Sequence, residues 1–136
     1  MTLIESLIAA ALLLTVVTAI LGALSAGHQH ALEAKRLVTA SLAAEDLMAR
    51  ITTARYSELE QWNGWNETPG TISGADDAPL PSLFNLIGRR VAIEPSSHEL
   101  DALKVLVRGS TVTIESYDQD GRTLTTLVRF IPEPQT

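Results

Sequence analysis

Glu5 and the amino group of Met1 are the first groups in the sequence that could do chemistry together, because they carry opposite charges at the head of an apolar segment. Glu5 is the only ionised side chain before His28, and the segment from Ser6 to Gly27 contains no charged residue. A carboxylate beside so much apolar surface is costly unless another group compensates for its charge. The ammonium of Met1, one helical turn away, could pair with Glu5 within one chain or between chains stacked with a small axial offset.

His28 and His30 are the next candidates, as metal ligands. They lie two residues apart, which on a helix points them to different sides, so hydrated residues at the level of the lipid head groups are the favoured interpretation. The sequence has no glycine-rich phosphate loop, no HExxH motif and no Gly-x-Ser-x-Gly motif. We therefore expect no enzymatic activity, no catalytic residue and no cofactor.

Asp118, Asp120 and Gly121 resemble the start of a calcium-binding loop, but the third acidic position and the distal Glu of such a loop are missing. A turn that carries solvated acids is the favoured interpretation. Asp76 and Asp77 could add further ligands, so the sequence leaves calcium binding open.

The part of the chain after Gly27 is acidic. It holds all ten Lys and Arg and fifteen of the sixteen acids, so its formal net charge is −5. Contacts with phosphates need clustered Lys and Arg, and the only basic pairs are Lys35-Arg36 and Arg89-Arg90. We therefore expect no nucleic-acid partner. The chain contains no Cys, which excludes disulfides.

The apolar segment allows three interpretations. A secretory signal peptide has a basic start and an apolar core of about 7 to 15 residues, whereas this segment starts with acidic MTLIE and is longer. A transmembrane helix fits, because about 22 residues at about 1.5 Å each span about 33 Å, near the thickness of the hydrocarbon core. A third interpretation adds a protein assembly in which a neighbouring chain supplies the partner of Glu5. The alternative for Glu5 is that it marks the membrane interface and is solvated there.

Residues 1–24, MTLIESLIAAALLLTVVTAILGAL, resemble the mature amino-terminal segment of type IV pilins and of the pseudopilins of type II secretion. The usual form of that segment is an aromatic residue or Met, then Thr-Leu-Ile-Glu, then a long apolar helix. The match covers about a fifth of the chain, and its motif is specific because Glu is otherwise rare in such a place.

The resemblance implies that a prepilin peptidase removes a leader peptide ending in Gly and that the new amino-terminus, here Met1, is methylated. Thr2 and Glu5 match the motif that aids docking into the growing filament. Many members have a Pro near the middle of the apolar helix, where this chain has Gly22, which lowers helix stability by about 1 kcal/mol relative to Ala. Gly22 is therefore a candidate helix break, although a fully helical segment with close packing at Gly22 is equally allowed.

The pattern predicts one helix of about 50 residues, far above the usual length. Its first half, residues 1–27, is hydrophobic and suits a membrane or a filament core. Its second half, residues 28–56, is amphipathic and is free of Pro and Gly. The predicted apolar stripe of the second half consists of Ala34, Leu37, Ser41, Ala44, Met48 and Ile51.

Residues 57–87 are predicted to be a connecting loop because Gly and Pro are concentrated there, with a short turn of helix near Ser82 to Leu86. Trp62 and Trp65 are its largest apolar groups and are expected to pin the loop to the head. The less favoured interpretation is that the two Trp side chains form an exposed contact patch.

Residues 88–136 alternate at a period of two and predict an antiparallel sheet that forms one head domain with residues 28–56. Turn signals at Gly109-Ser110 and at Asp118 to Arg122 separate the last three strands. One face of the sheet is expected to rest on the helix stripe between Leu37 and Ile51. The four predicted strands are 90–94, 103–108, 111–115 and 124–131, with Leu124, Thr126, Val128 and Phe130 on one face of the last. The expected fold is α+β and pilin-like: a long amino-terminal helix packed on a four-stranded antiparallel sheet.

These features predict a structural subunit of a type IV pilus-like or type II secretion pseudopilus filament. The resemblance implies copies of the chain and other pilins or pseudopilins as partners, besides the prepilin peptidase and an inner-membrane assembly platform. It also implies a single-pass location in the inner membrane before assembly and a periplasmic or cell-surface filament afterwards. The short head without Cys resembles minor pilins or pseudopilins, but an acidic head would also suit an abundant shaft subunit. The alternative is a monomeric membrane-anchored binding module that recognises a ligand through the Trp62 to Trp65 loop.

Overall fold

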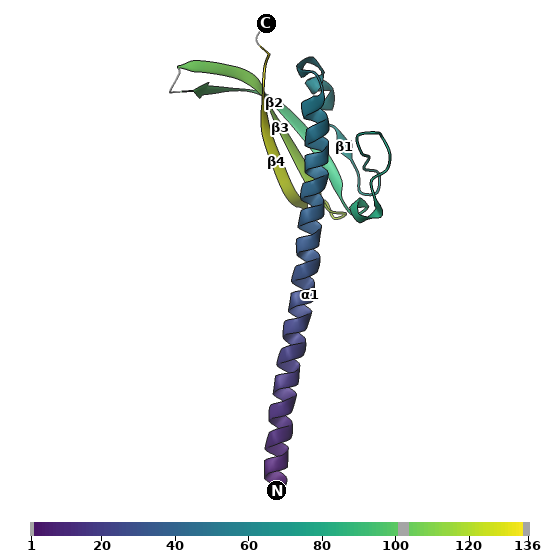
Figure 1. The fold of residues 1–136 in the computed structure, drawn as a ribbon, viewed down its shortest axis with the longest axis vertical. Helices are drawn as coiled ribbons and strands as arrows, with labels where there is room; N and C mark the ends of the chain where they lie inside the picture. The colour runs from purple at the N-terminus through teal and green to yellow at the C-terminus, as the bar shows by residue number, and fades with distance from the viewer. Residues whose placement is uncertain (1, 101–103, 135–136) are drawn as a thin grey trace. The chain divides into compact units, whose positions relative to one another are not determined.

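The computed structural model of this chain describes residues 2–100 and 104–134. The chain divides into two units, residues 1–35 and 36–136. A single helix, α1, belongs to both units, and all the strands belong to the second unit (Figure 1). The elements in chain order are α1 (Leu3–Thr53), the 3-10 helix η1 (Tyr56–Trp62), β1 (Asn66–Glu67), the 3-10 helix η2 (Ser82–Phe84), β2 (Gly88–Leu100), β3 (Val105–Tyr117) and β4 (Thr123–Pro132).

α1 is one uninterrupted helix of 51 residues, which confirms the prediction of a helix of about 50 residues. It ends at Thr53, three residues before the predicted end at Tyr56. The hydroxyl of Thr52 donates to the carbonyl of Met48 at 2.9 Å, and the hydroxyl of Thr53 donates to that of Arg50 at 2.8 Å. Threonine is a poor helix former, and such bonds to carbonyls of the preceding turn weaken the helix where it stops.

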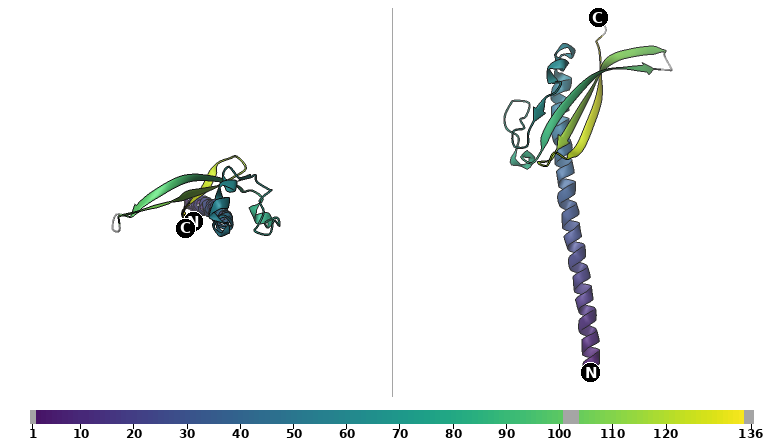
Figure 2. Two further views of the ribbon diagram at one scale, coloured as in Figure 1. Left: turned by 90° about the horizontal axis from the view of Figure 1, so that it is seen from above. Right: turned by 180° about the vertical axis from the view of Figure 1, so that it is seen from behind.

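The four strands form one sheet in the order β1-β2-β3-β4, and every neighbouring pair is antiparallel. The carboxy-terminal part of α1 packs on one face of this sheet, as Figures 1 and 2 show. The predicted fold class is therefore confirmed: the chain is α+β, with a long amino-terminal helix packed on a four-stranded antiparallel sheet. The predicted hairpin at Asp118 to Arg122 is also confirmed, since the N–H of Asp118 donates to the carbonyl of Arg122 at 3.0 Å.

The predicted turn at Gly109-Ser110 is wrong, because β3 runs straight through both residues. The predicted strands 103–108 and 111–115 are thus one strand, apart from positions 103 and 104, of which Leu103 lies outside the described residues. A Cβ at position 109 would overlap the carbonyl oxygen of Ile131 and lie 2.6 Å from Cζ of Phe130. Gly109 therefore serves the close approach of β4 to β3, and its absence of a side chain is a packing requirement.

The fourth strand comes instead from the predicted loop, residues 57–87. β1 pairs with β2 through Asn66 and Arg90 and through Glu67 and Arg89. The loop also contains η1, which the sequence did not predict, and η2, which confirms the predicted turn of helix near Ser82. Its Gly and Pro residues therefore separate short helices and a short strand, and the segment is not one continuous loop.

The predicted helix stripe is partly right. Ala44, Met48 and Ile51 are buried as predicted, whereas Leu37 is exposed and Ser41 is half-buried. The observed stripe begins further along the helix and is rich in small side chains, which let the helix approach the sheet closely. Its members are Thr39, Ala40, Ala43, Ala44, Leu47, Met48 and Ile51.

The prediction that Leu124, Thr126, Val128 and Phe130 share one face of the last strand is partly right, because the register puts the last three on one face and Leu124 on the other. Ile114 pairs with Leu127, and both face the main core cluster that also contains Leu47 and Met48. Val128 on the other face is 58% exposed. A register shift between Ser116 and Tyr117 changes which residues of β4 point inward, because the side-chain period of a strand is two. Of the four predicted residues, only Leu124 packs against a buried cluster, the smaller one formed by Ala40, Ala43, Ile72 and Ile87.

Candidate assembly site and polar clamp

Thr2 and Glu5 cap the start of α1. The backbone N–H of Thr2 donates to Oε2 of Glu5 at 3.4 Å, and the N–H groups of Glu5 and Ser6 donate to the carbonyl of Thr2 at 3.1 and 3.2 Å. A Thr followed three residues later by Glu is the spacing of a capping box, in which the Glu side chain reaches back to the first N–H. This role was not predicted, although the Thr-x-x-Glu spacing is a sequence signal for it. Glu5 thus has a partner within its own chain.

This bond leaves Glu5 with acceptor capacity. A carboxylate offers about four lone-pair sites on its two oxygens. Within the part of the chain that the structure describes, Oε2 takes the one hydrogen bond from Thr2 and Oε1 takes none. Met1 lies outside the described residues, so the pairing of its ammonium with Glu5 stays a prediction. Glu5 is exposed and able to accept a second donor.

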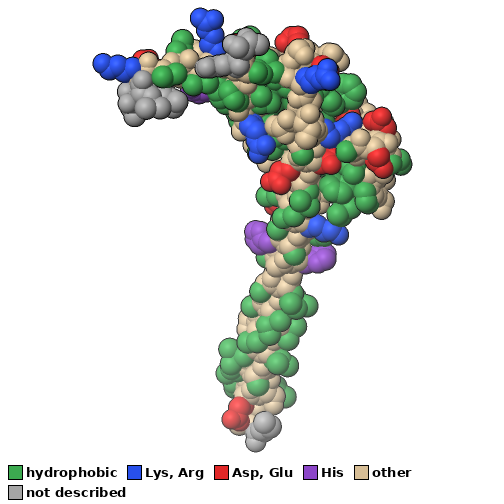
Figure 3. All heavy atoms as spheres, turned by 45° about the horizontal axis from the view of Figure 1, so that its top comes forward, with side chains coloured by type: hydrophobic (Ala, Val, Ile, Leu, Met, Phe, Trp, Pro, Cys, Tyr) green, Lys and Arg blue, Asp and Glu red, His purple; other side chains and the backbone are tan. Residues whose placement is uncertain are grey.

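The first half of α1 exposes apolar side chains all around its circumference. Leu12, Leu13 and Leu14 are consecutive, so they point in directions about 100° apart, and all three are exposed. Figure 3 shows hydrophobic side chains along the visible face of this helix. The large exposed residues here are Leu3, Ile4, Leu7, Ile8, Leu12, Leu13, Leu14, Val16, Val17, Ile20, Leu21 and Leu24.

α1 is the one helix in the described part of the chain that is long and apolar enough to cross a membrane. No residue of its apolar window is buried inside the structure, so it is not a core helix of the head. The hydroxyls of Thr15 and Thr18 are satisfied locally, since Thr15 donates to the carbonyl of Leu12 at 2.7 Å and Thr18 to that of Leu14 at 2.9 Å. A helix that is apolar all round is typical of a membrane span or of the core of a larger protein.

Gly22 lies inside α1, and the helix continues through it without a break. A Cβ at this position would meet nothing within 4 Å. The predicted break at Gly22 is therefore absent from the single chain, and a break or a close helix contact inside an assembly stays a prediction.

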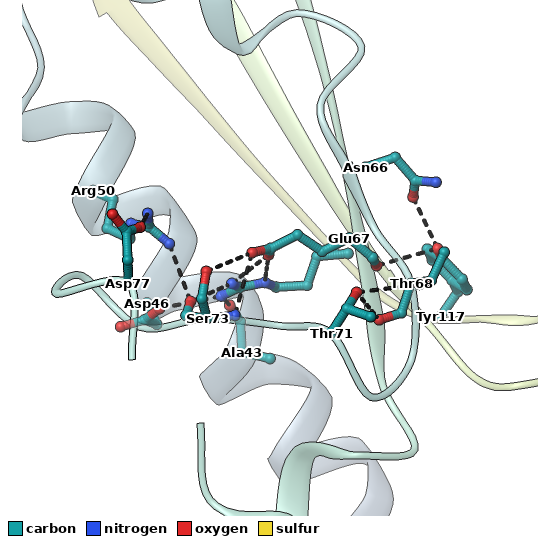
Figure 4. A network of polar contacts seen from close by, with 11 residues as sticks. Ala43, Asp46, Arg50, Asn66, Glu67, Thr68, Thr71, Ser73, Asp77 and Tyr117 are labelled. Carbon is teal, nitrogen blue, oxygen red and sulfur yellow. Dashed lines mark hydrogen bonds and ion pairs between the residues drawn. The ribbon is translucent and has the colours of Figure 1, made fainter. Parts of the chain in front are cut away.

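Arg89 is fully buried on the inward side of β2 and is the centre of a polar network. Its partners Glu67, Ser73, Ala43 and Asp46 are labelled in Figure 4. Its Nε donates to Oε2 of Glu67 at 2.7 Å, and its Nη2 forms an ion pair with the same oxygen. Nη1 donates to the carbonyl of Ala43 at 3.0 Å and to Oδ2 of Asp46 at 3.1 Å. Nη2 also donates to the carbonyl of Ser73 at 2.8 Å. All five N–H groups of the guanidinium thus have acceptors. We call these five residues the Arg89 clamp.

The Arg89 clamp joins the helix, the sheet and the loop that follows β1. Ser73 donates to Oε1 of Glu67 through its N–H at 3.3 Å and through its hydroxyl at 3.0 Å, so both oxygens of this buried carboxylate are satisfied. Arg50 donates to the carbonyl of Ser73 at 3.0 Å, and its guanidinium carbon lies 5.6 Å from the ring centre of Trp62. Buried charges are tolerated when they are paired and hydrogen-bonded in this way.

The clamp was not predicted, because Arg89 stands out in the sequence only as part of a basic pair. One signal was available, because Arg89 has the same parity as Val91 and Ile93 and so shares their inward face. An arginine on a buried face requires a buried acid. The identity of that acid, Glu67, could not be read from spacing because it lies 22 residues away in the predicted loop.

The residues considered for metal or acid chemistry are not brought together. No group of three or more His, Cys, Asp or Glu that could hold a metal ion occurs among residues 2–100 and 104–134. His28 and His30 lie on the exposed part of α1. Oδ1 of Asp118 accepts the N–H of Arg122 at 2.9 Å and that of Asp120 at 3.1 Å. These bonds, that from Arg122 above all, hold the pKa of Asp118 below its usual value.

An open groove of about 500 Å³ lies on the sheet face opposite to α1. Trp65, which is 41% exposed, lies on one side of it, and Tyr117 lies on another. Ala92 also lines it, and Arg90 and Glu115 form an ion pair there, with Nε and Oε2 2.5 Å apart. The two Trp side chains thus have separate roles: Trp62 packs against the core as predicted, whereas Trp65 borders the groove.

Comparisons of this chain with known protein families, with curated protein sequences and with solved structures gave no match. A functional assignment therefore depends on the residues and geometry described above.

Proposed function

We propose that this protein is a structural subunit of a type IV pilus-like or type II secretion pseudopilus filament. The proposal is carried by the first half of α1. It exposes large apolar side chains on every side, and the carboxylate of Glu5 in its first turn can accept a further hydrogen bond. In this proposal a prepilin peptidase exposes the amino-terminus, and an inner-membrane platform moves the chain from the membrane into a periplasmic or cell-surface filament.

Apolar burial provides most of the proposed assembly energy. In the membrane, acyl chains surround the helix, and in the filament the helices of neighbouring copies replace them. Burial of apolar surface that would otherwise contact water contributes about 25 cal/mol per Å². Because this term has no direction, it fixes neither the axial offset nor the orientation of neighbouring helices.

In this proposal Glu5 fixes the axial offset between neighbouring helices, which apolar packing alone does not fix. Its carboxylate holds the N–H of its own chain's Thr2 and accepts the terminal ammonium of a neighbouring copy as a second donor. A charged pair in an apolar surrounding penalises every offset that leaves either charge unpaired, so it sets register more than strength.

The test compares Glu5→Ala with Glu33→Ala, because both residues are exposed acids on the same helix. Glu5→Ala should leave the amount of protein in the membrane unchanged and reduce its fraction in sheared filaments about tenfold, the effect of losing about 1.4 kcal/mol. Glu33→Ala should change neither quantity. Normal incorporation of Glu5→Ala, or the absence of filaments in electron micrographs, would contradict the proposal. Mass spectrometry of the terminal residue tests the processing step.

The second candidate is a monomeric membrane-anchored binding module, and the groove beside Trp65 favours it. An open site with an aromatic wall and a few polar groups is typical of ligand binding. This alternative predicts that an unrelated apolar helix can replace residues 3–24 without loss of function. The filament proposal predicts that the same replacement abolishes incorporation.

A further inference from the structure

The far end of the β2–β3 hairpin projects beyond the rest of the sheet as a two-stranded arm. Ser97 to Leu100 pairs with Val105 to Arg108, whereas the register of β4 with β3 ends at Gly109. Figures 1 and 2 show this end of the hairpin extending away from β4. We call the paired residues 97–100 and 105–108 the arm. An isolated two-stranded hairpin is marginally stable in water, so a partner surface would stabilise the arm.

The arm carries an apolar side chain next to two opposite charges. Leu106 is 53% exposed and pairs with Glu99 across the arm. Arg108 lies two residues further along β3 and so shares the face of Leu106. Glu99 and Arg108 are both exposed. This face of the arm thus presents one exposed leucine beside an acid on the paired strand and a base on its own strand.

The groove has the matching features on a different part of the head. Its apolar lining includes Trp65 and the small side chain of Ala92, and its charged pair is Arg90 and Glu115. The side chain of Arg90 is 52% exposed, so its guanidinium can form an ion pair with a second carboxylate, such as that of Glu99 of another copy. Its volume of about 500 Å³ is ample for one leucine side chain.

The arm cannot fill the groove of its own chain. Thr113 borders the groove, and Leu106 lies seven residues before it on the same strand, which is a distance of about 23 Å along β3. An apolar projection and a complementary pocket at different places on one molecule can produce a head-to-tail contact, which continues from copy to copy as an open filament when its rotation does not close. A contact of that kind is what a filament requires.

We propose, on the basis of the filament function proposed above, that the arm of one copy docks in the groove of the next copy. Leu106 enters the apolar part of the groove against Trp65 and Ala92. Glu99 faces the guanidinium of Arg90, and Arg108 faces the carboxylate of Glu115. The partner at this site is therefore a second copy of this chain, and the contact links the heads of the filament in one direction.

Disulfide cross-linking tests the contact, and the Cys-free chain gives a clean background. The full chain with both Leu106→Cys and Ala92→Cys should form a ladder of dimers, trimers and longer species in oxidised filaments. Either substitution alone should give no cross-link, and a mixture of the two single variants should give dimers only. The two positions are about 23 Å apart within one chain, far beyond the reach of a disulfide, so every cross-link joins two copies.

The outcomes separate this inference from the filament function. Filaments without a ladder would overturn the arm contact and leave the function standing, whereas the absence of filaments would overturn the function itself. Dimers from Leu106→Cys alone would show an arm-to-arm contact and would also overturn the inference.

A second measurement uses Leu106→Asp and the matched control Leu83→Asp, because both residues are exposed apolar side chains of the head and Leu83 does not line the groove. Introducing a carboxylate into the apolar groove should reduce the incorporation of Leu106→Asp into filaments about tenfold. Leu83→Asp should assemble like the unmodified chain. Equal incorporation of the two variants would overturn the arm contact.

Discussion

The two halves of α1 differ in whether their apolar side chains are buried within the chain. Residues 3–35 expose Leu, Ile and Val in every direction, and none of them is buried within the chain. Residues 36–53 bury one stripe, which is dominated by Ala where the helix first meets the sheet. Small side chains let a helix approach a sheet closely. Large apolar side chains all around a helix are typical of a helix that is surrounded by lipid or by other protein. The size and distribution of apolar residues thus distinguish the half of α1 that buries its apolar stripe within the chain from the half whose apolar side chains stay exposed.

Polar groups repeat the contrast. In the second half of α1, Asp46 and the carbonyl of Ala43 bind Arg89, so polar contacts fix the helix to the sheet and loop. In the first half, Glu5 has only the N–H of Thr2 among the described residues. The head should therefore keep its stability when the first half is altered, and changes within the head should not affect membrane insertion.

The largest expected effect comes from Arg89→Ala. The substitution leaves the carboxylate of Glu67 buried without its cation, which should lower the free energy of unfolding by about 3–5 kcal/mol. Urea denaturation of the detergent-solubilised full chain measures this, because Trp62 and Trp65 are the only Trp residues and both report on the head. The amount of protein in the membrane should be unchanged.

Arg90→Ala is the matched control for this experiment. Arg90 is the neighbouring arginine, its side chain is 52% exposed, and it pairs with Glu115. Exposed ion pairs contribute about 0–1 kcal/mol, so the loss should be far smaller than for Arg89→Ala. If the two variants lost equal stability, the Arg89 clamp would not be what secures the head.

The next largest effect separates two leucines on one helix. Leu47 is 0% exposed and Leu42 is 51% exposed. Leu47→Ala should cost about 2–5 kcal/mol in the same denaturation experiment, because it leaves a cavity in the core. Leu42→Ala should change stability by no more than about 0.5 kcal/mol.

Leu14→Ala extends this test to the first half of α1. Leu14 is exposed in the single chain, so the substitution should leave the unfolding of the head unchanged and reduce incorporation into filaments. Loss of head stability in Leu14→Ala would mean that the two halves of α1 are not independent.

The sequence was sufficient for the fold class because its signals were local. The long helix follows from the absence of helix breakers between residues 28 and 63, and the sheet follows from alternation after residue 88. The predictions that failed depended on contacts between distant residues. Gly109 was interpreted as a turn, but its role is decided by the ring of Phe130, which belongs to the adjacent strand.

The same reason limits what could be predicted of the site. The cap at Thr2 and Glu5 was readable, because its two residues are three positions apart. The Arg89 clamp was not, because its acceptors come from α1, β1 and the loop after β1. The inward face of β4 was also beyond prediction, since the register shift at Ser116 depends on how β3 and β4 pair.

The smallest expected effect is a pH dependence confined to the head. Hydrogen bonds from Arg122 and Asp120 hold the pKa of Asp118 below its usual value of 3.8 in the folded chain. The folded state therefore binds a proton at this group less readily than the unfolded state does. The stabilisation is fully present above the unfolded pKa and is lost as the pH falls through the folded pKa.

Asp118→Asn removes this dependence, so the stability difference between it and the unmodified chain should be largest near neutral pH and should shrink as the solution is acidified below pH about 4. The effect should be small because the turn is exposed and water screens its charges. Asp120→Asn is the matched control, since the side chain of Asp120 takes no part in the hydrogen bonds of Asp118. Thermal unfolding followed by Trp fluorescence from pH 7 to pH 2 measures the difference. A difference that is constant across this range would show that the charge of Asp118 does not stabilise the turn.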